Sequence, residues 1–314
     1  MGVWTRSSSA SFGTRTSRAG DRVAELVRET GGVVDESTSG VGLAADITVR
    51  SIRSNEECHA CVELQRHVWG FEQPEIVPST LLHAVSYVGG LVAGAFDSND
   101  QLLGFVFGIT GIRDGALAHW SHMLGVHASA RNLGIGRRLK EFQRSVLADQ
   151  GVNRVFWSFD PLMAKNAYFN INRLGASVVE YVPDMYGTTA SPLHLGLATD
   201  RLIARLDSPP TVRVASPSTS YVGAPILTPI SRVGDSILSL GDRPPEKLLI
   251  EIPVDILDVI ASSRKTAEVW RLAVRDHFRW AFQHGYTVTD VVRDSGANRA
   301  FYALSRGGPT SPPP

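Results

Sequence analysis

A glycine-containing loop between an expected strand and an expected helix constrains the fold of this chain most strongly. The loop is Arg131–Gly136, with the sequence RNLGIG; it follows a strand over 118–126 and leads into a helix over 136–149. Glycine allows the backbone to turn tightly, so that several N–H groups can approach one anion. The helix dipole would stabilise a bound phosphate by ~0.5–2 kcal/mol, and Arg137 and Arg138 add positive charge. The pattern predicts a loop that binds a pyrophosphate.

Two common nucleotide-binding loops do not fit this pattern. A dinucleotide-binding loop has the pattern G-x-G-x-x-G after the first strand of its domain. Here no third glycine follows, and the strand before the loop is the fourth one expected. A P-loop needs a Gly-Lys-Ser/Thr run, which the chain lacks. A plain strand–helix turn with solvated arginines stays open as the alternative.

The order of expected strands and helices places the chain in the α/β class. Apolar and polar residues alternate in 47–52, the run 155–159 is typical of a short buried strand, and apolar residues recur at helical spacing in 136–149. The turn residues Asp97–Asp100 join two strands into a hairpin. We expect strands over 47–52, 91–96, 102–109, 118–126, 155–159 and 177–182, and helices over 56–68, 80–87, 136–149 and 164–173.

Composition divides the chain into five segments. Residues 1–45 lack a sustained apolar period apart from a short helix over 21–29, and 207–246 is rich in Pro and Ser. We expect a disordered or weakly ordered tail at 1–45, a main domain at 46–206, a loop or linker at 207–246, a smaller C-terminal α/β extension at 247–306 and a tail at 307–314. The extension has expected strands over 248–253, 287–292 and 300–304 and a helix over 264–283. In both units a helix ends at a glycine, Gly175 or Gly285, and leads into a strand, so the extension resembles a second, partial α/β unit.

Charge and hydropathy exclude several classes of partner. Lys+Arg and Asp+Glu both count 31, so a nucleic acid or an acidic membrane is not expected as a partner. No apolar run approaches the roughly 18 residues of a membrane span. The N-terminus is rich in Ser, Thr and Arg without an apolar core, which excludes a secretory signal. It is also typical of organellar transit peptides, but we favour a disordered tail and a cytoplasmic protein.

Cys58 and Cys61 are the only cysteines. A single C-x-x-C could be a redox pair or half of a zinc site, but no second pair completes a set of four ligands. Their place in the expected helix over 56–68 favours two helix thiols in a reducing compartment. We therefore expect no metal site.

The segment Val126–Leu139 resembles motif A of the GNAT superfamily of acyltransferases, V-x-P-x-x-R/Q-x-x-G-x-G/A. The element order over 47–206 matches that family, and runs such as Phe159-Asp160-Pro161 are shared with a subgroup that has long C-terminal extensions. The resemblance implies a mixed, splayed β-sheet flanked by helices. It also implies acetyl-CoA or another acyl-CoA as co-substrate, with pantetheine between the fourth and fifth strands. The residues expected to contact the cofactor are Leu124, Val126, Arg131, Asn132, Leu133, Gly134, Ile135, Gly136, Arg137, Arg138 and Asn166.

The same resemblance implies a reaction. A GNAT enzyme would be an acyl-CoA-dependent N-acyltransferase that moves an acetyl group, or another short acyl group such as succinyl, by direct transfer. The expected acceptor is the amine of a small molecule such as an amino acid or a specialised metabolite. A homodimer is compatible with the sequence, which leaves the acceptor, the acyl chain and the oligomeric state open.

Three histidines, His119, His122 and His127, flank the strand before the loop. Strand alternation places His122 on the same side as Leu124 and Val126. Histidine is the natural base at neutral pH, and the spacing is similar to that of the aralkylamine acetyltransferases, whose histidines on this strand serve proton removal. We predict His122 as the base or proton relay and His119 as the second candidate. A hydrogen-bonded histidine beside the core is the alternative.

The chain departs from the family at the residue that would serve as the general acid. GNAT enzymes often carry a tyrosine four residues before the glycine that ends this helix, and here that residue is Ile171. Tyr168 lies one helical turn earlier and is the candidate acid, with aromatic packing as the alternative. Tyr186 or a water molecule could substitute for it.

Two other classes of function stay open. One is a non-catalytic CoA-binding or regulatory module, which would agree with the missing tyrosine. The other is a GNAT fold that carries out other thioester chemistry, such as decarboxylation or transfer from a carrier protein. Arg50, Arg113 and Arg173 are candidate partners for a substrate carboxylate. We expect the extension to be a packing element that completes a sheet or a dimer face, although it could instead cover the acceptor site.

Overall fold

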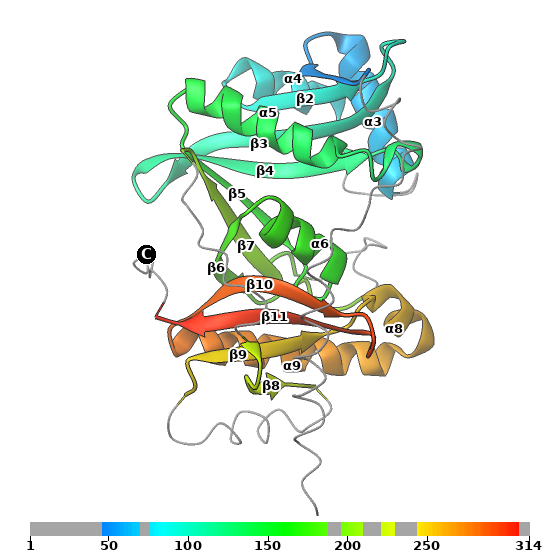
Figure 1. The fold of residues 1–314 in the computed structure, drawn as a ribbon. Helices are drawn as coiled ribbons and strands as arrows, with labels where there is room; N and C mark the ends of the chain where they lie inside the picture. The colour runs from blue at the N-terminus through cyan, green and yellow to red at the C-terminus, as the bar shows by residue number, and fades with distance from the viewer. Residues whose placement is uncertain (1–45, 70–75, 188–195, 210–220, 230–243, 308–314) are drawn as a thin grey trace, which may run out of the picture.

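The computed structural model describes residues 46–69, 76–187, 196–209, 221–229 and 244–307. The predicted tails, the short helix over 21–29 and most of the linker lie outside these residues. The described part of the chain contains two β-sheets, one of seven strands and one of four strands. Figure 1 shows the seven-stranded sheet above the four-stranded sheet, with helices against both.

The larger sheet has the strand order β1-β2-β3-β4-β5-β7-β6. Neighbouring strands are antiparallel except β4 and β5, which run parallel, so the sheet is mixed as predicted. The strands are β1 (Thr48–Ser51), β2 (Leu91–Phe96), β3 (Leu102–Arg113), β4 (Ala116–Val126), β5 (Arg154–Phe159), β6 (Ser177–Val182) and β7 (Arg201–Asp207).

Helices cover both faces of this sheet. Strand β3 shows the alternation directly, because Phe105 and Phe107 pack in one cluster with Leu64 and Leu82, while Val106 packs in another with Leu139. We call these the α3/α4 face and the α5 face. The helices of this part of the chain are α3 (Asn55–Trp69), α4 (Ser79–Tyr87), the 3-10 turn η1 (Ala128–Ala130), α5 (Ile135–Asp149), α6 (Ala164–Tyr168) and the π-helical turn η2 (Phe169–Arg173).

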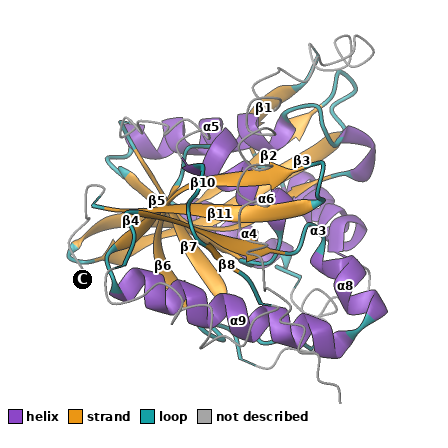
Figure 2. Cartoon of the chain, turned by 60° about the horizontal axis from the view of Figure 1, so that its bottom comes forward, coloured by secondary structure: helices purple, strands orange, loops and turns teal. Residues whose placement is uncertain are grey.

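The extension forms its own sheet and does not complete the first one. Its strand order is β10-β11-β9-β8, and Figure 2 shows a long helix lying along one side of it. Apolar side chains of both sheets, including Trp157, Tyr181 and Tyr302, belong to one continuous hydrophobic cluster with Phe278 of that helix. The elements are β8 (Ile226–Leu227), β9 (Lys247–Ile252), α8 (Ile256–Ser262), α9 (Arg264–Gln283), β10 (Tyr286–Asp294) and β11 (Arg299–Arg306).

The similarity between the two units goes beyond the helix-ending glycines. In the main domain, β5 is followed along the chain by a helix, β6 and β7, and the three strands lie in the sheet in the order β5-β7-β6. In the extension, β9 is followed by two helices, β10 and β11, and the three strands lie in the order β9-β11-β10. Each hairpin has a β-bulge, between Val178 and Glu180 in one and between Val288 and Asp290 in the other. Both bulges lie at the same separation from the preceding glycine. The extension thus repeats the β-α-β-β half of the main domain.

Partly buried ion pairs attach α9 to residues at the ends of strands in the larger sheet. Arg271 donates to both carboxylate oxygens of Asp160, at 2.9 and 2.5 Å. Arg275 donates to both oxygens of Asp200, at 2.8 and 2.5 Å, and Tyr181 donates to the same carboxylate at 2.7 Å. The shared hydrophobic cluster and these two ion pairs join the extension to the main domain.

Four elements of the described part, one of them the 3-10 turn η1, were not predicted from the sequence. Strand β7, helix α8 and the short strand β8 fall in segments that lack the expected periodicity, and β8 lies within the predicted linker at 207–246. The elements predicted within the described residues are present, with ends that differ by a few residues. Strand β3 extends four residues beyond the predicted end at 109.

Candidate functional site

Strands β4 and β5 pair over a short distance and then separate. Only His119 pairs with Val155 and Trp120 with Phe156, whereas β4 continues to Val126. Figure 1 shows the two strands diverging from this point. We call the space between the residues that follow Trp120 on β4 and those that follow Phe156 on β5 the β4–β5 split. The splayed sheet that the resemblance implied is therefore present.

The glycine loop lies at the end of β4, at the open end of the split. Gly134 is the N-cap of α5 and has a φ of 72°, a conformation that favours glycine, and no side chain caps the helix. The N–H groups of the first helical turn have no acceptor inside the helix. They are therefore available to an anion, and the dipole of the 15-residue helix favours one there.

Gly136 lies between the loop and the split. A Cβ atom on this residue would lie 3.5 Å from Phe169 Cζ and 3.6 Å from Leu124 Cδ2, which is ordinary van der Waals contact. The first turn of α5, strand β4 and the turn η2 thus meet at this point. An alanine would fit here, in agreement with the G/A alternative at this position of motif A.

The three loop arginines differ in their contacts. Arg137 pairs with Glu141 at 2.7 Å along the helix surface. Arg138 donates to the backbone carbonyl of Ile47, which ties the start of α5 to the residue before β1. Arg131 is exposed beside the helix N-terminus. Arg131 and Arg137 therefore present their charge at the surface, while Arg138 also has a structural role.

A β-bulge in β4 changes the side on which His122 lies. Phe107 of β3 pairs with Met123 and the next residue, Gly108, pairs with Ser121, so His122 is the additional residue. The ring of His122 lies 5.9 Å from that of Phe107, on the α3/α4 face. Leu124 packs on the α5 face instead. The predicted common side for His122, Leu124 and Val126 is wrong, because simple alternation does not hold across a bulge.

His119 is enclosed within the protein on the α5 face. The Thr110 hydroxyl donates its proton to the carbonyl of Gly89, so it accepts the hydrogen bond from His119 Nδ1–H at 3.0 Å. The other ring nitrogen, Nε2, accepts from the Gln143 amide at 3.1 Å. Burial, with a smaller contribution from Lys140, lowers the pKa of His119 to about 4. His119 is therefore a neutral, hydrogen-bonded core histidine, the alternative considered from the sequence.

His122 is exposed, and a second polar group lies near the split on the same face of the sheet. Trp120 and Phe156 pack together on this face, and alternation along β5 places Ser158 on the side of Phe156. The Ser158 hydroxyl lies 3.0 Å from the Tyr186 hydroxyl. Among the residues considered from the sequence, His122 and Tyr186 are thus on one face, while His119 is on the other.

Tyr168 and the asparagines lie on the segment that follows β5. Tyr168 is 43% exposed and the Arg173 guanidinium lies 5.8 Å from its ring. Asn170 is buried, accepts from Trp157 Nε1 at 3.1 Å and donates to the Asn166 side chain at 3.3 Å. Asn170 therefore has a structural role, whereas the contact of exposed Asn166 with a cofactor stays a prediction.

Of the arginines considered as carboxylate partners, two already have acidic partners. Arg50 pairs with Glu57 and Asp100, and Arg113 pairs with Glu180 at 3.2 Å. These contacts favour surface roles for both residues.

Sequence reasoning missed a buried lysine beside the split. The Lys140 ammonium donates to Ser121 Oγ at 2.7 Å and lies 4.1 Å from the centre of the Trp157 ring. Burial lowers its pKa to about 7. The signal was present in the sequence, since residue 140 follows Leu139 on the buried side of an amphipathic helix, where a lysine is unusual.

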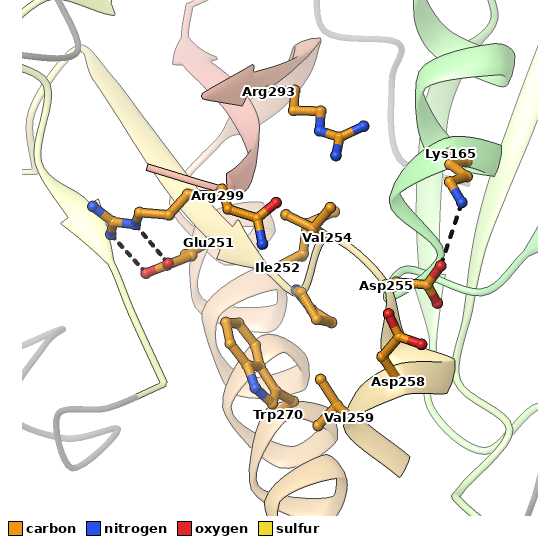
Figure 3. A pocket seen from close by; sticks show the side chains of 12 residues that line it. Lys165, Glu251, Ile252, Val254, Asp255, Asp258, Val259, Trp270, Arg293 and Arg299 are labelled. Atoms are coloured by element: carbon orange, nitrogen blue, oxygen red, sulfur yellow. Dashed lines mark hydrogen bonds and ion pairs between the residues drawn. The ribbon is translucent and has the colours of Figure 1, made fainter. Parts of the chain in front are cut away.

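A cavity of about 480 Å³ lies in the extension, beside the N-terminal end of α6 (Figure 3). Two ion pairs are part of its wall: Glu251 with Arg299 at 2.7 Å, and Lys165 with Asp255 at 3.3 Å. Trp270 contributes an aromatic surface, as the figure shows. No residue predicted for the cofactor or for catalysis lines this cavity.

The two cysteines lie in the interior of the protein on α3. Cys58 and Cys61 are free thiols, 2% and 0% exposed, and burial raises the pKa of both. Within the described ranges no cluster of three or more His, Cys, Asp or Glu side chains could hold a metal ion. Nor does the described part of the chain contain a helix long and apolar enough to cross a membrane.

No protein-family model matches the chain, and no curated protein matches it. Solved structures are similar over about half of it. Aminoglycoside 6'-acetyltransferase type Ii is 20% identical, with 52% of this chain and 99% of that chain covered and a TM-score of 0.42. The ribosomal-protein-S18-alanine N-acetyltransferase from Escherichia coli is 15% identical, with 51% and 93% covered and a TM-score of 0.41. A chain of the NatC complex bound to Gag peptide and CoA is 13% identical, with 52% and 98% covered and a TM-score of 0.42.

Proposed function

We propose that the chain is an acyl-CoA-dependent N-acyltransferase of the GNAT type. The observation that carries the proposal is the β4–β5 split, whose open end lies beside the uncapped N-terminus of α5. A long, narrow ligand with a pyrophosphate at one end and an extended arm at the other suits this arrangement. Acyl-CoA has that shape, and the resemblance of Val126–Leu139 to motif A points to the same ligand.

The chain supplies two kinds of group to such a ligand. The N–H groups of the first turn of α5, from Ile135 to Arg137, would bind the pyrophosphate. Beyond Trp120, strand β4 has no β5 neighbour, so Leu124 and Val126 can offer backbone groups to the pantetheine amides. These contacts would place the thioester near the closed end of the split.

Acyl transfer requires that the acceptor amine lose a proton as it attacks the thioester carbon. His122 is the group that we propose as the base or proton relay, because it is exposed and lies at the bulge beside the closed end of the split. The amine would therefore approach from the α3/α4 face, on which Ser158 and Tyr186 also lie. We propose a small-molecule amine as the acceptor.

The test is thiol release from acetyl-CoA and succinyl-CoA in the presence of amine panels. The panels contain amino acids, amino sugars, aryl-alkylamines and, as a competing class, short peptides with free N-termini. The expected result is amine-dependent release with at least one small-molecule amine and one preferred thioester. Turnover with peptides alone would contradict the proposed acceptor class, and release that no amine accelerates would contradict N-acyl transfer.

A non-catalytic CoA-binding module is the second candidate function. The observation that favours it is Ile171, which stands where the family often has its tyrosine and is 2% exposed within the hydrophobic cluster. No hydroxyl is available from that position. Tight binding of CoA without turnover on any amine would support this candidate.

A further inference from the structure

Lys140 projects from α5 into the interior of the protein. Lys140 is 5% exposed. The ammonium donates to Ser121 Oγ at 2.7 Å and to Gln143 Oε1 at 3.4 Å, and it lies over the Trp157 ring at 4.1 Å. Its three N–H groups are thus matched by a hydroxyl, an amide oxygen and an aromatic face.

The position of these partners defines where the charge lies. Trp120 and Phe156 form the last pair between β4 and β5, and Ser121 and Trp157 are the next residue on each strand. The Lys140 ammonium therefore contacts the first side chain beyond the last pair on both strands. The ammonium lies at the closed end of the β4–β5 split, on the α5 face of the sheet.

This charge has no acidic partner in the described part of the chain. The groups that face it are Ser121 and, through Gln143, the neutral His119 from β4, and Trp157 from β5. Burial alone lowers its pKa to about 7. A methionine or leucine would fill the same space without the cost of removing a charge from water. A lysine here needs a reason other than packing.

We propose that Lys140, acting through the Ser121 hydroxyl, supplies the proton that the thiolate of CoA takes up when the acyl group leaves. This inference rests on the proposed acyltransferase function and deepens it. As the carbon–sulfur bond breaks, the thiolate takes the Ser121 hydroxyl proton and the serine oxygen takes a proton from the Lys140 ammonium. The lysine is left as a neutral amine. The acceptor amine loses one proton in the reaction, and this proton returns to Lys140 by way of His122 or water. The ammonium is thereby restored, and no other reactant is needed.

The contacts are consistent with this direction of transfer. Ser121 accepts from Lys140, so its own O–H is available to a sulfur in the split. A group that is half protonated near neutral pH suits an acid that must give up and regain a proton in every turnover. In this scheme Ser121 meets the reacting atoms and Lys140 is a positioning residue that acts through it. Together they would replace the tyrosine that is missing at Ile171.

The experiment measures the pKa of the CoA thiol bound to the protein, from the ultraviolet absorbance of the thiolate as a function of pH. The proteins compared are the wild type, Lys140→Met, Ser121→Ala and Arg144→Met. The last substitution is the matched control, because it removes a positive charge one turn further along α5. Calorimetry with CoA establishes binding to each protein before the titration.

At neutral pH we expect CoA bound to the wild type and to Arg144→Met to carry at least about tenfold more thiolate than free CoA in the same buffer, which is about one pKa unit. We expect Lys140→Met and Ser121→Ala to bind CoA and to lose this enrichment. Equal thiolate fractions in the wild type and both variants would overturn the inference while leaving the proposed function intact. Failure of the wild type to bind CoA would instead refute the proposed function. If Lys140→Met does not fold, Ser121→Ala, a smaller change, decides the outcome.

Discussion

Trp120 of β4 pairs with Phe156 of β5, and beyond this pair the two strands separate. The pair fixes the closed end of the split, and the groups proposed for catalysis are arranged around it. His122 follows on the α3/α4 face, while Ser121 and Lys140 lie on the α5 face. The bulge in β4 and the end of its pairing with β5 therefore bring the proposed base and the proposed proton donor to opposite faces of the sheet at nearly the same point.

The His122 side chain is expected to contribute to turnover and not to stability. We predict that His122→Ala lowers kcat/KM by ~10²-fold or more, the usual contribution of a general base. CoA affinity and the thermal midpoint should change little, because the side chain is exposed. The assay is thiol release with the best amine, and His59→Ala, an exposed histidine on α3, is the control. Full activity of His122→Ala would remove His122 from the mechanism.

Lys140 should make the stability of the protein depend on pH. Burial lowers its pKa from 10.5 to about 7, so between these values the unfolded chain binds more protons than the folded one. The free energy of unfolding must then rise with pH across this window. From about pH 6 to about pH 10 the wild type should gain roughly 4 kcal/mol relative to Lys140→Met, at 1.36 kcal/mol per pKa unit. Urea unfolding at a series of pH values measures the difference, and parallel curves would show that the lysine is not buried as described.

His277 of α9 is buried, and neither ring nitrogen has a hydrogen-bond partner among the residues that the structure describes. Burial lowers its pKa from 6.5 to about 4, so the unfolded chain binds more protons between these values and stability falls as the pH falls through the window. His277→Leu should be more stable by roughly 1–3 kcal/mol at neutral pH, since unsatisfied buried groups are removed. It should also lose less stability in acid. Thermal unfolding at neutral pH and near pH 5, with exposed His59→Leu as the control, tests both effects.

The ion pair of Arg271 with Asp160 attaches the extension to the main domain. Arg271→Met leaves the Asp160 carboxylate without its bidentate partner in a partly buried site. We expect a loss of roughly 3 kcal/mol in the free energy of unfolding, measured by urea denaturation. Arg279→Met, at an exposed position of the same helix, should change it by less than about 0.5 kcal/mol. Equal effects of the two substitutions would show that the pair contributes nothing specific.

Much of the fold could be predicted because its signals are local. The alternation in 47–52 and the helix-ending glycines after 136–149 and 164–173 depend on neighbouring residues alone. Strand β7 was missed because its charged residues interrupt the apolar pattern. In the structure the charge of Arg201 lies 3.7 Å from Asp160, a residue far away in the sequence. A compensating partner of this kind cannot be read from a short segment.

The site shows the same limit. The glycine loop was predicted from six consecutive residues. The side of the sheet on which His122 lies depends on a bulge that only the pairing with Phe107 and Gly108 defines. The burial of Lys140 on α5 likewise depends on Ser121 of β4 and Trp157 of β5. Local patterns predicted where a cofactor would bind, whereas the groups that could act on it were positioned by contacts between distant segments.

The central claim is that the N-terminus of α5 and the split beyond it bind acyl-CoA. The most direct test is a calorimetric titration of CoA, acetyl-CoA and succinyl-CoA into the wild type, Gly134→Glu and Gly151→Glu. Gly134 and Gly151 lie at opposite ends of α5, with φ angles of 72° and 76°, and a Cβ atom on either would have no neighbour within 4 Å. The two variants therefore share the same backbone strain and the same added charge. We predict micromolar binding to the wild type and to Gly151→Glu and no binding to Gly134→Glu. Absence of binding to the wild type, or equal binding to both variants, would contradict the claim.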